Sequence, residues 1–114
     1  MNRIIVLRVV RRVTPLGHVA VGDMTAIDVW REICGGHPEE IQSVSFRLPG
    51  RSIITLRSLI GFRRYGGISN ADLRRWIINS NYDAPGTDLV FEINYSEEDR
   101  SIEYTFLGKL DRRV

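Results

Sequence analysis

The chain has 114 residues, of which 43% are hydrophobic and 26% are charged, and its formal net charge at pH 7 is +2. A chain of this length can hold one domain with its own core and is too short for two domains of ordinary size. The composition is that of a soluble globular protein, no apolar run reaches the length of a membrane span, and the net charge is too small to indicate a nucleic-acid partner. We therefore expect one soluble domain over residues 1–114.

The N-terminal segment MNRIIVLRVVRRV begins like a signal peptide, but three arginines interrupt its apolar residues and it lacks a small-residue cleavage site. Its nearly unbroken apolar residues instead predict a strand over residues 3–12, followed by a turn at 14–17 and a short extended piece at 18–21. Cys34 is the single cysteine, which excludes an internal disulfide and fits a reducing compartment. We therefore expect a cytoplasmic protein.

Two helices are indicated by their start and stop signals. In each, Thr or Ser is followed three residues later by Asp, in TAID at 25–28 and SNAD at 69–72, so that the hydroxyl can cap a free backbone N–H and the carboxylate favours the helix N-terminus. Gly35–Gly36 ends the first helix because glycine tolerates the left-handed C-cap conformation, and the polar run at 79–86 ends the second. Apolar residues at helical spacing form a buried face in each helix, with Ile27, Trp30, Ile33 and Cys34 in the first and Leu73, Trp76 and Ile77 in the second.

Four further strands are predicted at 41–48, 52–65, 88–96 and 101–110. A tight turn at Pro49–Gly50 joins the first two, and the EEDR turn joins the last two. Three of these strands are apolar mainly on one side, as in a sheet with one face in water. The residues expected on the buried side are Val44, Phe46 and Leu48, then Leu89, Phe91, Ile93 and Tyr95, and then Ile102, Tyr104, Phe106 and Leu110.

The predicted order of elements is β-α-β-β-α-β-β in an α+β domain. The strands at 3–12 and 52–65 carry apolar residues on both sides, which favours positions in the middle of a sheet. A ferredoxin-like two-layer sandwich has β-α-β-β-α-β order with its first and third strands at the centre, and right-handed crossovers allow both βαβ units. We therefore predict a ferredoxin-like sandwich with an antiparallel sheet, two helices on one face and the last strand added at an edge.

Helices on one face leave the other face of the predicted sheet open. A contiguous apolar patch on such a face usually marks an interface, so we hypothesise a homodimer packed through it. The alternative is that residues 13–24 or the C-terminal hairpin cover this face within one subunit. The apolar residues expected on the open face are Ile4, Val6, Val10, Ile53 and Leu59.

Arginines supply the candidate binding surface. Strand alternation places Arg8, Arg57 and Arg63 on the open face, where they could bind an anion or nucleic acid. Tyr65 ends the segment GFRRY, which has a faint likeness to the aromatic strand of RNA-recognition domains but lacks their alternating aromatic run. The near-neutral net charge favours the alternative, in which the arginines border a dimer interface or keep the protein soluble.

Two other groups of residues could carry chemistry. CGGH at 34–37 offers two metal ligands or a Cys–His pair, but a zinc site needs three or four ligands and the sequence identifies no orienting third residue. The sequence therefore favours a buried cysteine at a glycine helix end. Glu92 and Glu103 could bind a cationic ligand if they lie beside Trp30 or Trp76, whereas the tryptophans are better explained as core.

No catalytic, cofactor or metal motif assigns a function, and the sequence shows no specific resemblance to a known family. We expect a small non-enzymatic ligand- or protein-binding module that self-associates and uses neither a cofactor nor a metal. An arginine-surface nucleic-acid binder is the alternative, and an enzyme whose site forms at a dimer interface ranks third.

Overall fold

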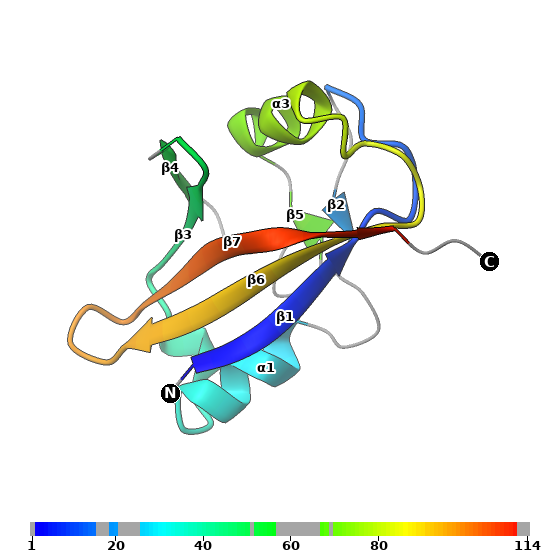
Figure 1. The fold of residues 1–114 in the computed structure, drawn as a ribbon. Helices are drawn as coiled ribbons and strands as arrows, with labels where there is room; N and C mark the ends of the chain where they lie inside the picture. The colour runs from blue at the N-terminus through cyan, green and yellow to red at the C-terminus, as the bar shows by residue number, and fades with distance from the viewer. Residues whose placement is uncertain are drawn as a thin grey trace.

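The computed structural model describes residues 2–15, 19–20, 26–50, 52–56, 67–68 and 70–111 (Figure 1). Its strands are β1 (Asn2–Arg8), β2 (Val19–Ala20), β3 (Ser43–Leu48), β4 (Ser52–Leu56), β5 (Gly67–Ile68), β6 (Thr87–Ser96) and β7 (Ser101–Asp111). Its helices are α1 (Ala26–Ile33), the short 3-10 helix η1 (Pro38–Glu40) and α3 (Ala71–Asn79). No helix in the described ranges has the length and apolar character needed to cross a membrane.

Five strands form one mixed sheet in the order β1-β6-β7-β3-β4, and β2 pairs with β5 in a separate two-stranded sheet. Neighbouring strands in the large sheet are antiparallel except for β3 and β7, which are parallel. The α+β class is therefore confirmed. The ferredoxin-like strand order is not confirmed, and the expectation of an antiparallel sheet is wrong because of the β3–β7 pair.

Strands β1 and β4 lie at the edges of the sheet, although their two-sided apolar pattern predicted central positions. The hairpin of β6 and β7, strands of 10 and 11 residues, takes the middle instead, with β1 beside β6 and β3 beside β7. The second apolar side of each edge strand stays at the surface, since Ile4 is 56% exposed and Ile53 is 57% exposed. A two-sided apolar strand therefore does not specify a central strand in this chain.

One face of the sheet holds the core. The predicted alternation of buried residues is confirmed on β3 and, for Leu89, Phe91 and Ile93, on β6, whereas Tyr95 is half-buried. Three aromatic rings from neighbouring strands meet there: the ring centroid of Phe46 lies 5.6 Å from that of Phe91 and 4.6 Å from that of Tyr104. Such ring pairs stabilise a core by about 1 kcal/mol beyond the area they bury. The fully buried residues of the sheet include Leu7, Val44, Phe46, Leu89, Phe91, Ile93, Ile102 and Tyr104.

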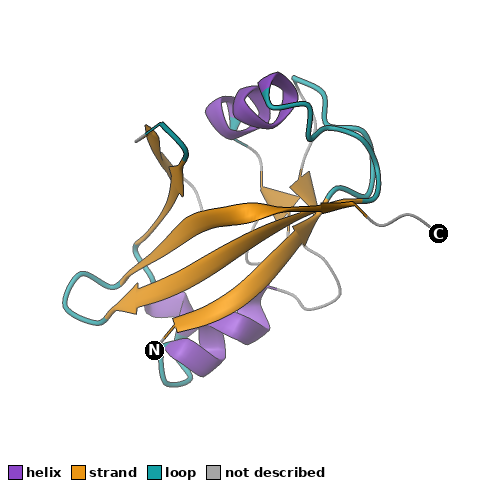
Figure 2. Cartoon of the chain, in the orientation of Figure 1, coloured by secondary structure: helices purple, strands orange, loops and turns teal. Residues whose placement is uncertain are grey.

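Both helices pack against this same face, as predicted. Trp30 of α1 is fully buried and its Nε1 donates a hydrogen bond to the Tyr104 hydroxyl at 2.9 Å. The ring of Trp76 on α3 lies edge-on to Phe106, with centroids 4.9 Å apart. Tyr104 and Phe106 are two residues apart on β7, so their side chains point to the same side of the sheet. In the view of Figure 2, α1 lies below the long β6–β7 hairpin and α3 lies above it.

The start of α3 differs by one residue from the prediction. Asn70, not Ser69, is the N-cap: its backbone is extended, and its side-chain oxygen accepts a hydrogen bond from the Leu73 N–H at 2.9 Å. Asn caps a helix as well as Ser does, so two adjacent capping residues leave the start ambiguous in sequence. Thr25 and Ser69, the two predicted caps, lie outside the described residues.

The predicted strand at 3–12 is longer than the strand observed, and only the first part of the predicted strand at 52–65 is described. β1 ends at Arg8 rather than at residue 12, although the Val9 N–H still donates to the Thr87 carbonyl at 2.9 Å. Farther along, Val13 is buried and its N–H donates to the Asp83 carbonyl at 3.0 Å. β4 is described to Leu56, and residues 57–66 of the predicted strand lie outside the described part of the chain.

A register shift interrupts the β6–β7 hairpin. Phe91 pairs with Phe106 whereas Val90 pairs with Gly108, so Leu107 is an extra residue on β7. Side chains beyond a bulge point to the opposite face from the one that strict alternation gives. Leu110 is therefore 59% exposed, and the prediction that it belongs to the buried side is wrong.

We expect the hydrogen bond between Trp30 and Tyr104 to couple α1 to the sheet. Trp30→Phe removes the indole N–H and leaves a space in the core, which should lower the free energy of unfolding by about 3 kcal/mol. Trp30→Phe, Tyr104→Phe and the double variant form a double-mutant cycle with the unchanged protein. Denaturant unfolding of all four should give a coupling free energy of about 1 kcal/mol between the two residues. Strict additivity of the two single losses would show that the bond does not hold the helix to the sheet.

Candidate functional site

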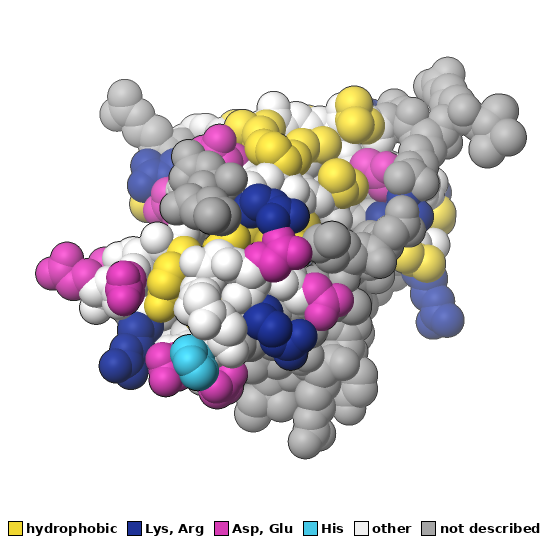
Figure 3. All heavy atoms as spheres, turned by 90° about the horizontal axis from the view of Figure 1, so that it is seen from below, with side chains coloured by type: hydrophobic (Ala, Val, Ile, Leu, Met, Phe, Trp, Pro, Cys, Tyr) yellow, Lys and Arg dark blue, Asp and Glu magenta, His cyan; other side chains and the backbone are white. Residues whose placement is uncertain are grey.

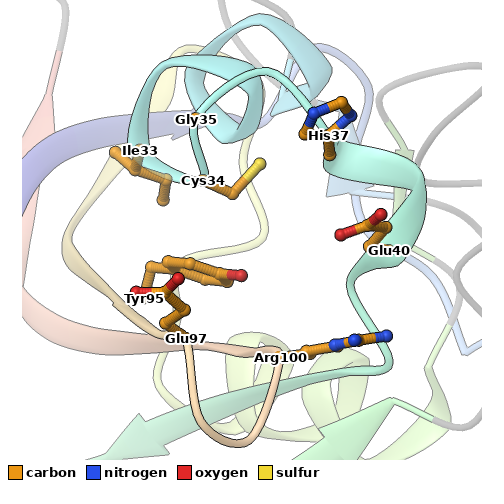
Figure 4. Close-up of a pocket in the computed structure, with 8 residues that line it drawn as sticks. All are labelled: Ile33, Cys34, Gly35, His37, Glu40, Tyr95, Glu97 and Arg100. Carbon is orange, nitrogen blue, oxygen red and sulfur yellow. The ribbon is translucent and has the colours of Figure 1, made fainter.

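A pocket of about 700 Å³ opens where the end of α1 meets the turn between β6 and β7 (Figure 4). Three segments contribute its walls: the end of α1, the η1 segment and the β6–β7 turn. This volume lies within the range of small-molecule binding sites. The lining residues are Ile33, Cys34 and Gly35, then His37 and Glu40, then Tyr95, Glu97 and Arg100.

The end of α1 is shaped by its two glycines, as the sequence predicted. The Cys34 N–H donates to the Trp30 carbonyl at 3.0 Å, and the Gly36 N–H donates to the Arg31 carbonyl at 2.9 Å. Gly35 and Gly36 have φ angles of +73° and +98°, which only glycine adopts readily. The chain therefore reverses direction directly after Cys34 and brings the η1 segment to the opposite side of the pocket, as Figure 4 shows.

The β6–β7 turn is held by its own polar groups and by the segment that precedes β3. The Ser96 hydroxyl accepts a hydrogen bond from the Asp99 N–H at 3.3 Å, and the Gln42 N–H donates to the Arg100 carbonyl at 2.7 Å. Arg100 has a φ angle of +51°, in the left-handed region where a residue with a Cβ is disfavoured by about 1–2 kcal/mol. Such strain clusters at functional sites, and here it falls on a pocket residue.

The pocket contains charges of both signs and two polar groups of other kinds. Figure 4 shows the Cys34 thiol, the Tyr95 hydroxyl and the Glu40 carboxylate directed toward its interior, with the Arg100 guanidinium below Glu40. Cys34 and Tyr95 are half-buried and pack against the core, so one wall of the pocket is continuous with the core of the domain. The arrangement can bind charged and hydrogen-bonding groups at the same time as an apolar group.

His37 lies at the rim of the pocket and belongs to a local acidic turn. Its Nδ1 is 3.5 Å from Oε1 of Glu39, and both side chains are exposed. The pKa of Glu39 lies below its usual value, chiefly because the carboxylate accepts a hydrogen bond from its own backbone N–H and additionally because His37 is nearby. Within the described ranges, no three His, Cys, Asp or Glu side chains lie close enough together to hold a metal ion.

The arginines predicted to bind a ligand are not assembled by the described structure. Arg8 contacts Asp88 through a 3.1 Å bond from Nε to Oδ1, and the Asp88 side chain is 4% exposed. Arg8 therefore neutralises a buried carboxylate, which explains its position without an external anion. Arg57, Arg63 and Tyr65 lie outside the described residues, so their binding role stays a prediction.

The predicted cation site is not formed, because the sheet separates its carboxylates from its tryptophans. Glu92 and Glu103 lie near each other on the open face, where Glu103 contacts Arg47 through two 3.3 Å hydrogen bonds. Trp30 is 0% exposed and lies on the covered face, where Trp76 also packs. The explanation of the tryptophans as core is the one that the structure supports.

The residues expected in one apolar patch lie at opposite edges of the sheet. Ile4 and the half-buried Val6 belong to β1, and Ile53 belongs to β4, with three strands between them. Val10 follows β1 and is 56% exposed, and Leu59 lies outside the described residues. A single contiguous patch of these residues does not exist within the described structure.

Reasoning from the sequence identified Cys34 and His37 as candidate residues, but it did not identify most of the other residues that line the pocket. The sequence places Glu97 and Arg100 in a predicted turn and Tyr95 on a buried strand face, and it gives no role to Glu40, which precedes the predicted strand at 41–48. The strand pairing that unites these segments is not visible in sequence. Arg100 itself was one signal in the sequence for an unusual turn. It occupies the last position of a four-residue turn, and this position usually holds Gly or Asn.

No family model, curated protein or solved structure matches the chain. The pocket and the surface of the sheet are therefore the features that bear on its function.

We expect the left-handed conformation of Arg100 to be a local weakness of the fold. Arg100→Gly removes the Cβ strain, and after allowing for the greater freedom of glycine in the unfolded chain it should raise the free energy of unfolding by about 0.5–1 kcal/mol. Denaturant unfolding measures the change. Asn81→Gly is the matched control, since Asn81 has a φ angle of +61° but is a residue that tolerates this region, and its gain should be smaller. A loss of stability in Arg100→Gly would show that the side chain is structural.

Proposed function

We propose that this chain is a cytoplasmic, non-enzymatic binding module whose ligand occupies the pocket at the end of α1. The observation that carries the proposal is the convergence of a thiol, a phenol, a guanidinium and carboxylates from three chain segments on one cavity of about 700 Å³. Polar groups that converge on a cavity beside an apolar wall are the usual form of a small-ligand site. The free Cys34 supports a reducing compartment.

The pocket supports binding better than catalysis. A cysteine nucleophile needs an adjacent base that is itself oriented by a third group. Cys34 and His37 both line the cavity, but no hydrogen bond joins these two described residues, and the His37 Nδ1 is directed toward Glu39. The side chains therefore offer contacts for a ligand without the arrangement that would activate the thiol.

The single cysteine makes the pocket directly testable, because Cys34 can report its occupancy. We expect a mixture of small metabolites, added in fractions sorted by charge, to slow the alkylation of Cys34 by a maleimide. At ten times the Kd of the ligand the rate should fall about tenfold, since only the free fraction reacts. The matched control is the double variant Cys34→Ser/Glu98→Cys, which moves the thiol to an exposed turn residue outside the pocket. Equal protection of both thiols, or of neither, would contradict the proposal.

A second candidate property is self-association through the open face near β1. Val6 and Val90 pair in register, and Val90 pairs with Gly108 on the next strand. Large exposed side chains surround this pair, and Figure 3 shows hydrophobic side chains gathered along one side of the surface. We name the set the β1–β7 apolar surface; it consists of Ile4, Val6, Val90, Leu107 and Leu110. Clustered apolar side chains of this kind favour an interface, and we propose a homodimer formed through them.

The two edges of the sheet provide a matched test of this dimer. Light scattering at micromolar concentration should give the mass of two chains. Ile4→Glu places a negative charge in the β1–β7 apolar surface beside Glu92, its cross-strand partner, and should weaken the dimer by at least about tenfold, because burying an unpaired charge is strongly unfavourable. Ile53→Glu adds the same charge at a residue with matching exposure on the far edge and should leave the dimer intact. A strict monomer, or a dimer disrupted only by Ile53→Glu, would contradict the proposal.

A further inference from the structure

The charges in the pocket point to the class of its ligand. We infer that the pocket binds the head group of an α-amino acid, with the carboxylate at Arg100, the ammonium at Glu40 and an apolar side chain against Ile33, Cys34 and Tyr95. The inference rests on the proposed binding function and adds the chemical identity of the ligand. It follows from three features of the pocket: the position of Arg100, the position of Glu40 and the character of the opposite wall.

Arg100 is the carboxylate-binding group. A guanidinium binds a carboxylate through two parallel N–H···O bonds, which gives both strength and orientation. Within the described part of the chain Arg100 forms no ion pair, whereas Arg3, Arg8, Arg12 and Arg47 each contact an acidic residue. Its backbone is held by the bond from Gln42, so its side chain leaves the turn from a fixed point.

Glu40 is the ammonium-binding group. It lies two residues before Gln42, so the bond between Gln42 and Arg100 holds the Glu40 segment beside the Arg100 turn. Figure 4 shows the Glu40 carboxylate and the Arg100 guanidinium on the same side of the pocket. An α-amino acid carries its ammonium and its carboxylate on one carbon, so its two charges match two opposite charges that lie side by side.

The wall across the pocket is suited to an apolar side chain. Ile33 is buried at the end of α1, and Cys34 and Tyr95 pack against the core. In Figure 4 these residues lie on the side away from Glu40 and Arg100, with Glu97 beside Tyr95 at its edge. A ligand held by its head group would therefore direct its side chain toward the core of the domain, where burial favours an aliphatic or aromatic group.

A ligand with one charge fits less well. A simple anion at Arg100 would leave the Glu40 carboxylate, on the same side of the pocket, without a partner and facing a like charge. A simple amine at Glu40 would face the Arg100 guanidinium. A zwitterion satisfies both groups and brings no net charge into the pocket, which is why we favour it over an anion or an amine.

The inference is tested with L-leucine, L-phenylalanine and L-methionine, each compared with its N-acetyl form and its amide. The N-acetyl form lacks the ammonium and the amide lacks the carboxylate. Binding is followed by protection of Cys34 from alkylation and by amide chemical shifts of residues 33–42 and 95–101. We expect at least one free amino acid to bind about tenfold or more tightly than either of its counterparts, since each counterpart leaves a charged group of the site without its partner.

Three variants assign the two ends of the ligand. Arg100→Gln should weaken the free amino acid by about tenfold and abolish its advantage over the amide, and Glu40→Gln should abolish its advantage over the N-acetyl form. Glu98→Gln is the control, since Glu98 is exposed on the same turn but does not line the pocket. It should leave every affinity unchanged.

The possible failures are distinguishable. If a metabolite fraction protects Cys34 but none of the three amino acids does, the binding function stands and the ligand class is wrong. Equal binding of a free amino acid and its N-acetyl form or amide would also overturn the inference. If no fraction protects Cys34, the proposed function fails as well.

Discussion

The parallel pairing of β3 with β7 is the contact on which the rest of the arrangement depends. Ser43 and Ser101, the first residues of the two strands, are partners in this pair. Parallel strands that start side by side bring the segments before them to the same end of the sheet. The segment before β3 contains the end of α1 and η1, and the segment before β7 is the β6–β7 turn. One pairing therefore sets the middle of the sheet and places both walls of the pocket next to each other.

Local features of the fold could be predicted from the sequence because they depend on neighbouring residues. The alternation of Phe46 with its polar neighbours gives the buried face of β3, and Gly35–Gly36 gives the end of α1. The strand order could not be predicted, since it depends on which long-range pairs form, and the two-sided apolar pattern of β1 is satisfied equally by a central position or by an exposed edge. The bulge at Leu107 on β7 likewise depends on the pairing between strands, and it turns Leu110 to the surface.

The residues of the candidate site also divide into those that the sequence could indicate and those that it could not. Cys34 and His37 could be recognised because they lie three residues apart in the chain, but Arg100 is separated from them by the whole of β3 to β6. The high arginine content of the sequence was a poor guide to the binding site. Most described arginines near the sheet contact acidic residues of the same chain, as Arg8 does with the buried Asp88. What distinguishes Arg100 is its local conformation and its place in the cavity, and neither is encoded in a short motif.

The separation in sequence between Ser43 and its partner Ser101 has a consequence for how the pocket forms during folding. The β6–β7 hairpin is closed by a short turn and can form locally, whereas pairing β3 with β7 must first close a long loop of chain, which is slow on entropic grounds. The two walls of the pocket therefore meet only where the β3–β7 pairing has formed. The hairpin by itself carries the Arg100 turn but makes no cavity, so the site depends on a contact between distant parts of the chain.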